Sequence, residues 1–186
     1  MSPEELQEIR DGVSRLCATF PMEYWRELDR ERRYPTDFVR ALTEAGYLSA
    51  LIPEEYGGSG LSLSAAAAIL EEIQRSGANG AACHAQMYIM GTLLRHGSTA
   101  QKQKYLPAIA DGSLRLQAFG VTEPTAGTDT TSIRTTAVKK GDRYVINGQK
   151  VWTSRAEHSD VMLLLARTTP REQVTKKSEG MSVFIV

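Results

Sequence analysis

The sequence predicts an α+β protein whose first part is helical and whose second part is rich in strands. Up to about residue 113, apolar residues recur at helical spacing, and after it their period changes to two. Two turn signals, Lys140-Gly141-Asp142 and Asn147-Gly148, separate β-branched and aromatic runs in the second part. We therefore expect an N-terminal helical domain over residues 1–113 and a mostly antiparallel, β-barrel-like domain over residues 114–186.

Six helices are expected in the first part. Ser2, Pro3 and Glu5 are typical of a capped helix start, and an apolar face follows as far as Cys17. Ser98-Thr99-Ala100-Gln101 gives the same capping signal for the last helix, which we expect to end near residues 111–112. The helices between them are expected at about 22–32, at 38–45 with Gly46 as a stop, at 64–77 and at 81–97, with a loop over 51–62.

Six short runs of the second part favour strands, and Asn147-Gly148 predicts a hairpin between the third and the fourth. They span residues 114–121, 133–140, 143–148, 150–154, 161–168 and 181–186. The last run, MSVFIV, is an apolar strand after which a sheet partner would normally follow. We therefore expect the β domain to be truncated at this end.

The composition limits the possible functions. Lysines and arginines number 22, as do aspartates and glutamates, so charge alone gives no reason to expect nucleic acid as a partner. No apolar run approaches the roughly 20 residues of a membrane span, and the first residues resemble no targeting signal, so we expect a cytoplasmic protein. Two distant cysteines suit a reducing compartment, and three scattered histidines predict no metal site.

Two segments are candidates for a binding site: FGVTEPTAGTDTT at 119–131 and NGQKVWTS at 147–154. They combine small hydroxyls, a glycine and one tryptophan, with neither a nucleophile–base pair nor a glycine-rich phosphate loop. These groups suit a flat ring with polar edges, held by backbone donors and one aromatic wall. The alternative is an ordinary β domain with threonines on exposed faces and Trp152 in its core.

The same two segments closely resemble the flavin-contacting signatures of acyl-CoA dehydrogenases, and the resemblance extends over most of the chain. DRERRYPTDFVRALTEAGYLSALIPEEYGGSGLS and GSTAQKQKYLPAIADGSLRLQAFGVTEP look like the family's N-terminal helices and the entry into its β domain. The resemblance implies FAD as cofactor and an acyl-CoA as substrate. It also places the catalytic glutamate in a C-terminal helical domain that is absent from these residues. No catalytic residue is therefore assigned, and Glu123 is interpreted as a structural residue of its loop.

The resemblance also implies roles for individual residues. Those expected to line the cofactor are Phe119, Val121, Thr122, Gly127, Thr128, Trp152, Thr153 and Ser154. Thr128 and Ser178 are expected to contact the substrate, and Lys176 and Lys177 either meet CoA phosphates or are solvated charges. Thr128 and Arg155 depart from the family's usual serine and asparagine.

The resulting hypothesis is FAD-dependent α,β-dehydrogenation of an acyl-CoA thioester. An electron-transfer flavoprotein is the expected partner, and the full-length form is expected to be a homo-oligomer. Two alternatives are a related acyl-CoA oxidase or flavin monooxygenase, which differ in how fast the reduced flavin meets oxygen. A third is a non-catalytic binding module. The chain alone is expected to associate, because an apolar end strand would be uncovered, and to bind FAD weakly.

Overall fold

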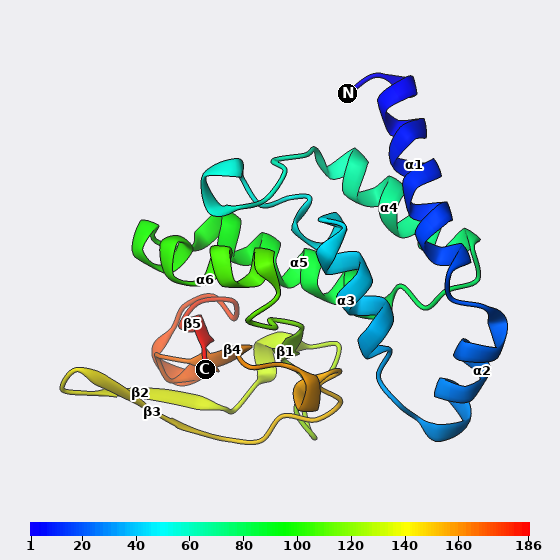
Figure 1. The fold of residues 1–186 in the computed structure, drawn as a ribbon. Helices are drawn as coiled ribbons and strands as arrows, with labels where there is room; N and C mark the ends of the chain where they lie inside the picture. The colour runs from blue at the N-terminus through cyan, green and yellow to red at the C-terminus, as the bar shows by residue number, and fades with distance from the viewer. The chain divides into compact units, whose positions relative to one another are not determined.

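The computed structural model describes residues 1–186 and divides into two compact units, Met1–Arg115 and Leu116–Val186. The first is helical and the second contains a single sheet (Figure 1). This confirms the α+β class and the helical first part. No helix is long and apolar enough to cross a membrane.

Local signals set the helix ends of the first unit. Its helices are α1 (Pro3–Ala18), α2 (Met22–Glu31), α3 (Thr36–Glu44), α4 (Leu63–Arg75), α5 (Ala81–His96) and α6 (Thr99–Asp111). Both predicted capping boxes are present, at Ser2 with Glu5 and at Ser98 with Gln101. α3 ends two residues before Gly46, whose φ of 78° is left-handed and stops the helix.

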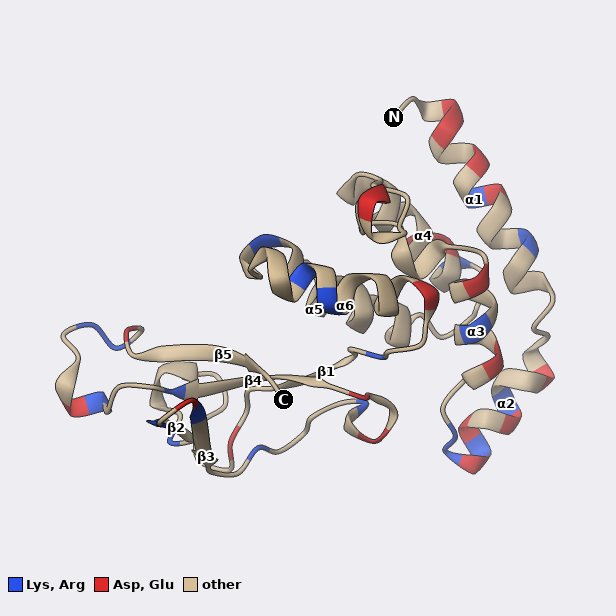
Figure 2. Cartoon of the chain, turned by 60° about the vertical axis from the view of Figure 1, so that its left-hand side comes forward, with Lys and Arg blue, Asp and Glu red and all other residues tan.

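Packing of apolar helix faces builds the core of the first unit. α1 lies along α4, and both contribute to a cluster that also contains Phe38, Leu42 and Ile69. The two cysteines are buried in the same cluster. Outside the core, acidic and basic residues alternate along α2, as expected for a helix with one solvated face (Figure 2).

The sheet of the second unit is organised around one strand. Its strands are β1 (Ala118–Gly120), β2 (Thr136–Lys140), β3 (Arg143–Asn147), β4 (Met162–Arg167) and β5 (Met181–Ile185). β5 pairs with β4 along one edge, antiparallel and over residues 163–167. β1 and β2 share the other edge: both are parallel to β4, β1 beside residues 162–164 and β2 beside Arg167. β3 forms an antiparallel hairpin with β2.

The expected mostly antiparallel, barrel-like domain is therefore wrong: the sheet is mixed and open. Turn signals predict only strands that are neighbours in sequence, and the β2–β3 hairpin at Gly141-Asp142 is such a pair. Parallel pairs need long connections, and the segments that join β1 and β2 to β4 supply them.

The expected strand at 150–154 and the hairpin at Asn147-Gly148 are also wrong. β3 ends at Asn147, and no strand follows until β4. Trp152 and Arg155 have φ values of 60° and 59°, which an extended strand cannot contain. The expected strand at 114–121 is reduced to Ala118–Gly120.

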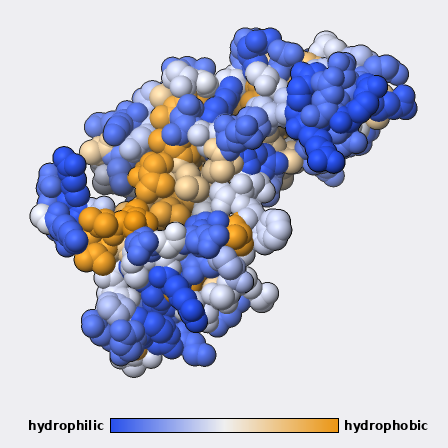
Figure 3. Space-filling view, turned by 90° about the horizontal axis from the view of Figure 1, so that it is seen from below, coloured by the Kyte–Doolittle hydropathy of each residue, from blue (hydrophilic) through white to orange (hydrophobic).

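Several large apolar side chains of the second unit remain exposed. They are Val138, Tyr144, Val145, Trp152, Val183 and Val186. Figure 3 shows hydrophobic residues gathered in patches among hydrophilic ones on the face that it displays. Trp152 is the extreme case, with 89% of its surface exposed, so the alternative that placed it in a core is wrong.

Candidate functional site

The first candidate segment begins in β1 and then leaves the sheet, because β1 and β2 pair with different residues of β4. β1 ends opposite Leu164, and β2 begins opposite Arg167. The chain between them, residues 121–135, therefore forms a loop at this edge instead of continuing the ladder. The loop contains most of the residues of FGVTEPTAGTDTT. Sheet topology thus places these small polar groups together at the surface of the unit.

A buried ion pair joins this loop to the second candidate segment. The Nζ atom of Lys150 lies 2.8 Å from Glu123 Oε1 and also donates to the carbonyl of Val121, at 2.9 Å. The side chains of Glu123 and Lys150 are only 4% and 8% exposed. In addition, the Val151 amide donates to the carbonyl of Thr122, at 2.9 Å. The structure therefore brings together the two segments that are almost 30 residues apart in sequence.

Glu123 is held as an anion. Burial alone raises the pKa of its carboxyl, but hydrogen bonds from Lys150 and from the backbone amides of Arg134 and Thr135 outweigh this effect and lower the pKa to about 2. A general base needs a pKa near the working pH and a free oxygen. Glu123 has neither, which supports its interpretation as a structural residue of the loop.

The segment after Lys150 is fixed at both ends and strained between them. At the far end, the Ser159 hydroxyl donates to the Arg155 carbonyl and accepts from the Gln117 amide, beside β1. Between these anchors, Trp152 and Arg155 both have left-handed φ values. A non-glycine residue there costs roughly 1–2 kcal/mol. The anchors keep the indole of Trp152 turned out to solvent.

The remaining predicted residues surround these contacts. Phe119 lies in β1, Val121 and Thr122 follow it, and Thr153 and Ser154 follow Trp152. Gly127 is exposed, and a Cβ atom added to it would meet no protein atom within 4 Å. Its φ is not left-handed either. The fold therefore does not require glycine at position 127. A ligand that approached the backbone closely would require it, because a side chain there would be in the way.

Thr128 lies in the loop 121–135 and Ser178 in the loop that precedes β5, and one side chain connects these two loops. Arg167, at the end of β4, donates to the carbonyls of Thr131 and Lys177. Sequence reasoning missed both Arg167 and the role of Lys150. A signal was available for Arg167, because a charged residue that ends the apolar run MLLLAR must find partners when it is buried.

With this geometry established, comparisons with known proteins identify the family. The model of the acyl-CoA dehydrogenase N-terminal domain matches residues 3–113, and that of the acyl-CoA dehydrogenase middle domain matches residues 118–186. The chain belongs to the acyl-CoA dehydrogenase family. It is 40% identical over 161 residues to cyclohex-1-ene-1-carbonyl-CoA dehydrogenase of Syntrophus aciditrophicus, which covers 86% of this chain and 38% of that protein.

Solved structures agree with this assignment. The fold is similar to that of the acyl-CoA dehydrogenase from Geobacillus kaustophilus, with a TM-score of 0.91 and 28% identity over all of this chain and 48% of that one. A chain in a structure of the electron transferring flavoprotein of Acidaminococcus fermentans gives a TM-score of 0.88 and 31% identity, with 100% of this chain and 48% of that chain covered. The chain thus spans less than half the length of each of these relatives.

The structure bears on one of the positions at which the chain departs from the resemblance. The resemblance predicts asparagine at position 155, and the chain has Arg155. Its φ of 59° lies in the left-handed region, where asparagine is several-fold enriched among non-glycine residues. The backbone at this position therefore suits asparagine better than arginine, and Arg155 adds local strain.

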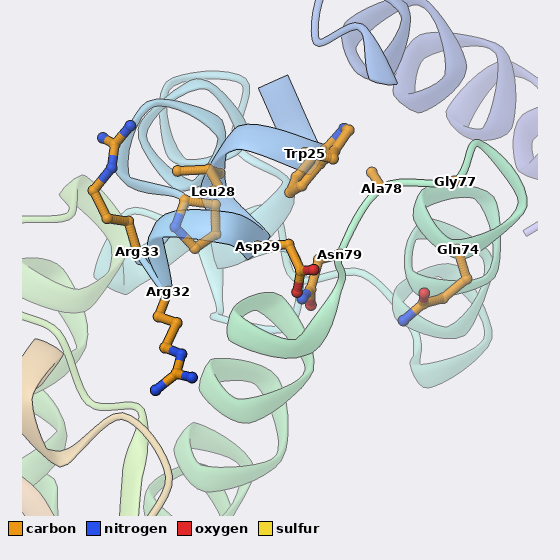
Figure 4. Close-up of a pocket in the computed structure, with 10 residues that line it drawn as sticks. Trp25, Leu28, Asp29, Arg32, Arg33, Gln74, Gly77, Ala78 and Asn79 are labelled. Atoms are coloured by element: carbon orange, nitrogen blue, oxygen red, sulfur yellow. The ribbon is translucent and has the colours of Figure 1, made fainter. Parts of the chain in front are cut away.

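A hollow of about 700 Å³ lies in the first unit, and none of the predicted flavin residues lines it. It lies between α2 and the connection from α4 to α5. Figure 4 shows Trp25 facing Ala78, and Asp29 beside Asn79, with the Arg33 side chain directed away. Arg33 instead pairs with two glutamates of its own helix region.

Proposed function

We propose that the chain forms the flavin- and thioester-contacting part of an FAD-dependent acyl-CoA dehydrogenase. The observation that carries this proposal is the joining of segments 119–128 and 150–154 by the Glu123–Lys150 pair, beside an indole that is 89% exposed. The indole of Trp152 does not pack in the core of the unit, and its backbone is strained. It suits a flat ligand that would cover it.

The residues present fit a flavin. Trp152 offers one face, Thr122 and Ser154 offer compact donors or acceptors, and backbone near Gly127 is open to close approach. Phe119, Val121, Thr128 and Thr153 complete the set that would hold the cofactor, and Thr128 and Ser178 would contact the substrate. A bound flavin supplies the two-electron acceptor that α,β-dehydrogenation of an acyl thioester requires.

The chain's own residues then bind and orient. Trp152 would stack on the ring, and the small hydroxyls would fix its polar edge. No residue of the chain is assigned as the base that removes the α-proton, and Glu123 is held as an anion by three hydrogen bonds. Transfer of the electrons to an electron-transfer flavoprotein and assembly into a homo-oligomer are further parts of the proposal.

The first test is a titration with FAD, in which flavin absorbance and fluorescence report binding. We expect the chain to perturb the flavin spectrum and to quench its emission, and a Trp152→Leu variant to bind about tenfold more weakly. Trp25→Phe is the matched control, because Trp25 is the other tryptophan and lies in the first unit. A wild-type chain that leaves the flavin spectrum unchanged at saturating FAD would refute the proposal.

Anaerobic addition of octanoyl-CoA to the FAD-loaded chain tests the substrate and the base. We expect a spectral perturbation without bleaching, because a thioester binds while no residue here removes its α-proton. Bleaching would show that these residues include their own base. Absence of any perturbation would refute the thioester site.

A further inference from the structure

A buried cation at the end of β4 is surrounded only by main-chain oxygens. Arg167 is 4% exposed and forms none of the ion pairs of the structure. Its Nε atom donates to the carbonyl of Ile133 at 3.1 Å, and its Nη1 atom to that of Glu179 at 3.2 Å. Its Nη2 atom donates to the carbonyls of Thr131 and Lys177. Four of its five N–H groups are therefore used on backbone.

These carbonyls belong to two loops that lie outside the strands of the sheet. Thr131 and Ile133 lie in the loop that precedes β2, next to Thr128, whereas Lys177 and Glu179 lie in the loop that precedes β5 and contains Ser178. Arg167 stands between them, because its backbone pairs with Thr135 and β2 on one side and with β5 on the other. A single planar guanidinium thus fixes the main chain of both loops.

The charge of Arg167 also has no anionic partner. Carbonyl dipoles solvate a buried cation but do not neutralise it. Lys176 and Lys177 lie on one of the loops, and the carboxylate of Glu179 on that loop accepts from the Lys176 amide. On the other loop, Glu123 pairs with Lys150, and Asp129 accepts from the hydroxyls of Thr131 and Ser132 and is near enough to Lys177 to feel its charge. An anion against these loops would meet a favourable field.

We infer that Arg167 is a positioning residue for a phosphate-bearing thioester, which it serves by clamping the loops of Thr128 and Ser178 in a fixed relation. This inference rests on the proposed function. Arg167 itself is covered by the loops and would not touch the ligand.

The test compares Arg167→Met and Arg167→Lys with Arg171→Met. Arg171 is an arginine of the same connection that has no hydrogen bond or ion pair, so its variant removes one positive charge without releasing a carbonyl. Hydrogen exchange of residues 129–133 and 176–180 is measured together with the affinities for FAD and octanoyl-CoA. Circular dichroism checks that each variant is folded.

Arg167→Met is expected to speed exchange in both loops and to weaken octanoyl-CoA binding about tenfold, with a smaller loss of FAD affinity, because Thr128 belongs to both proposed sets. Arg167→Lys keeps the charge and some donors, so its exchange rates and its octanoyl-CoA affinity should lie between those of Arg167→Met and the wild type. Arg171→Met should leave exchange in both loops unchanged and weaken octanoyl-CoA binding by no more than about twofold. If Arg167→Met does not fold, Arg167→Lys is judged against the wild type by the same two measurements.

Unchanged exchange, or unchanged octanoyl-CoA affinity in a folded variant of Arg167, would overturn the inference. A wild-type chain that binds FAD but not octanoyl-CoA would instead refute the proposed substrate and the ligand role of Arg167 with it. The two failures are thus distinguished by the behaviour of the wild type.

Discussion

Replacing Glu123 by glutamine tests whether the buried pair with Lys150 holds the candidate site together. The substitution keeps the size of the side chain but removes its charge, which leaves the ammonium of Lys150 buried opposite a neutral amide. Breaking one partner of a buried pair typically costs about 3–5 kcal/mol. We therefore expect Glu123→Gln to be among the most destabilising single changes in the second unit.

The pKa of Glu123 gives a second value, which covers burial and the hydrogen bonds from the Arg134 and Thr135 amides as well as the pair with Lys150. A carboxyl whose pKa falls from 4.5 in the unfolded chain to about 2 in the fold contributes about 3 kcal/mol at neutral pH. Because the folded pKa is the lower one, this stability is fully present above pH 4.5 and is lost as the pH falls towards 2. Roughly 2 kcal/mol of it should be gone at pH 3.

Urea unfolding at pH 7 and pH 3, monitored by the methyl NMR signal of Ile133, measures the cost of Glu123→Gln and the stability that the wild type loses at low pH. This side chain is buried in the second unit, so its signal reports that unit and not the helices. Glu157→Gln, an exposed glutamate of the same unit, is the control for loss of a negative charge. The double variant Glu123→Gln/Lys150→Met removes both charges and should recover part of the loss.

A Glu123→Gln variant that unfolds within about 0.5 kcal/mol of the wild type at pH 7 would refute the reasoning. So would a wild type that loses no more stability than the variant between pH 7 and pH 3. Either result would mean that Lys150 does not engage Glu123 as the structure has it.

Three further outcomes are expected. Gly148→Ala should destabilise the second unit by about 1–3 kcal/mol in urea unfolding, because the added Cβ atom would lie 2.3 Å from Thr135 Oγ1. Gly127→Ala, whose Cβ atom would meet nothing within 4 Å, should change the free energy of unfolding by less than about 0.5 kcal/mol. Ser98→Ala removes a capping box and should cost about 1 kcal/mol, seen as faster hydrogen exchange at the start of α6. Trp152→Gly should not lower the thermal midpoint, since it relieves a left-handed φ, yet it should weaken FAD binding; a lowered midpoint would contradict the strain.

Features set by neighbouring residues could be predicted from the sequence. The capping boxes at Ser2 and Ser98 depend on residues three positions away, and the structure contains both. The position of Gly46 after α3 is of the same kind. The two candidate segments could also be proposed from the sequence, because they are defined by residue types that lie close together in it. The roles of their individual residues stay predictions.

Features set by distant pairing could not be predicted. Residues 150–154 have the composition of a strand, but Lys150 turns inward to Glu123 and the backbone at Trp152 is left-handed. Neither fact is encoded within those five residues. The parallel contacts of β4 escaped for the same reason, because turn signals describe only strands that follow one another.

The place of β4 in the sheet has a consequence for how the protein is made. Ala118 pairs with Met162, so β1 and the loop after it have no sheet to join until residues 162–167 have left the ribosome. At ordinary rates of translation this wait lasts on the order of a few seconds. The helical unit, Met1–Arg115, has its own compact set of contacts, and its residues have all been synthesised by then. Codon choice between residues 120 and 162 therefore sets how long the nascent candidate loop stays exposed to chaperones.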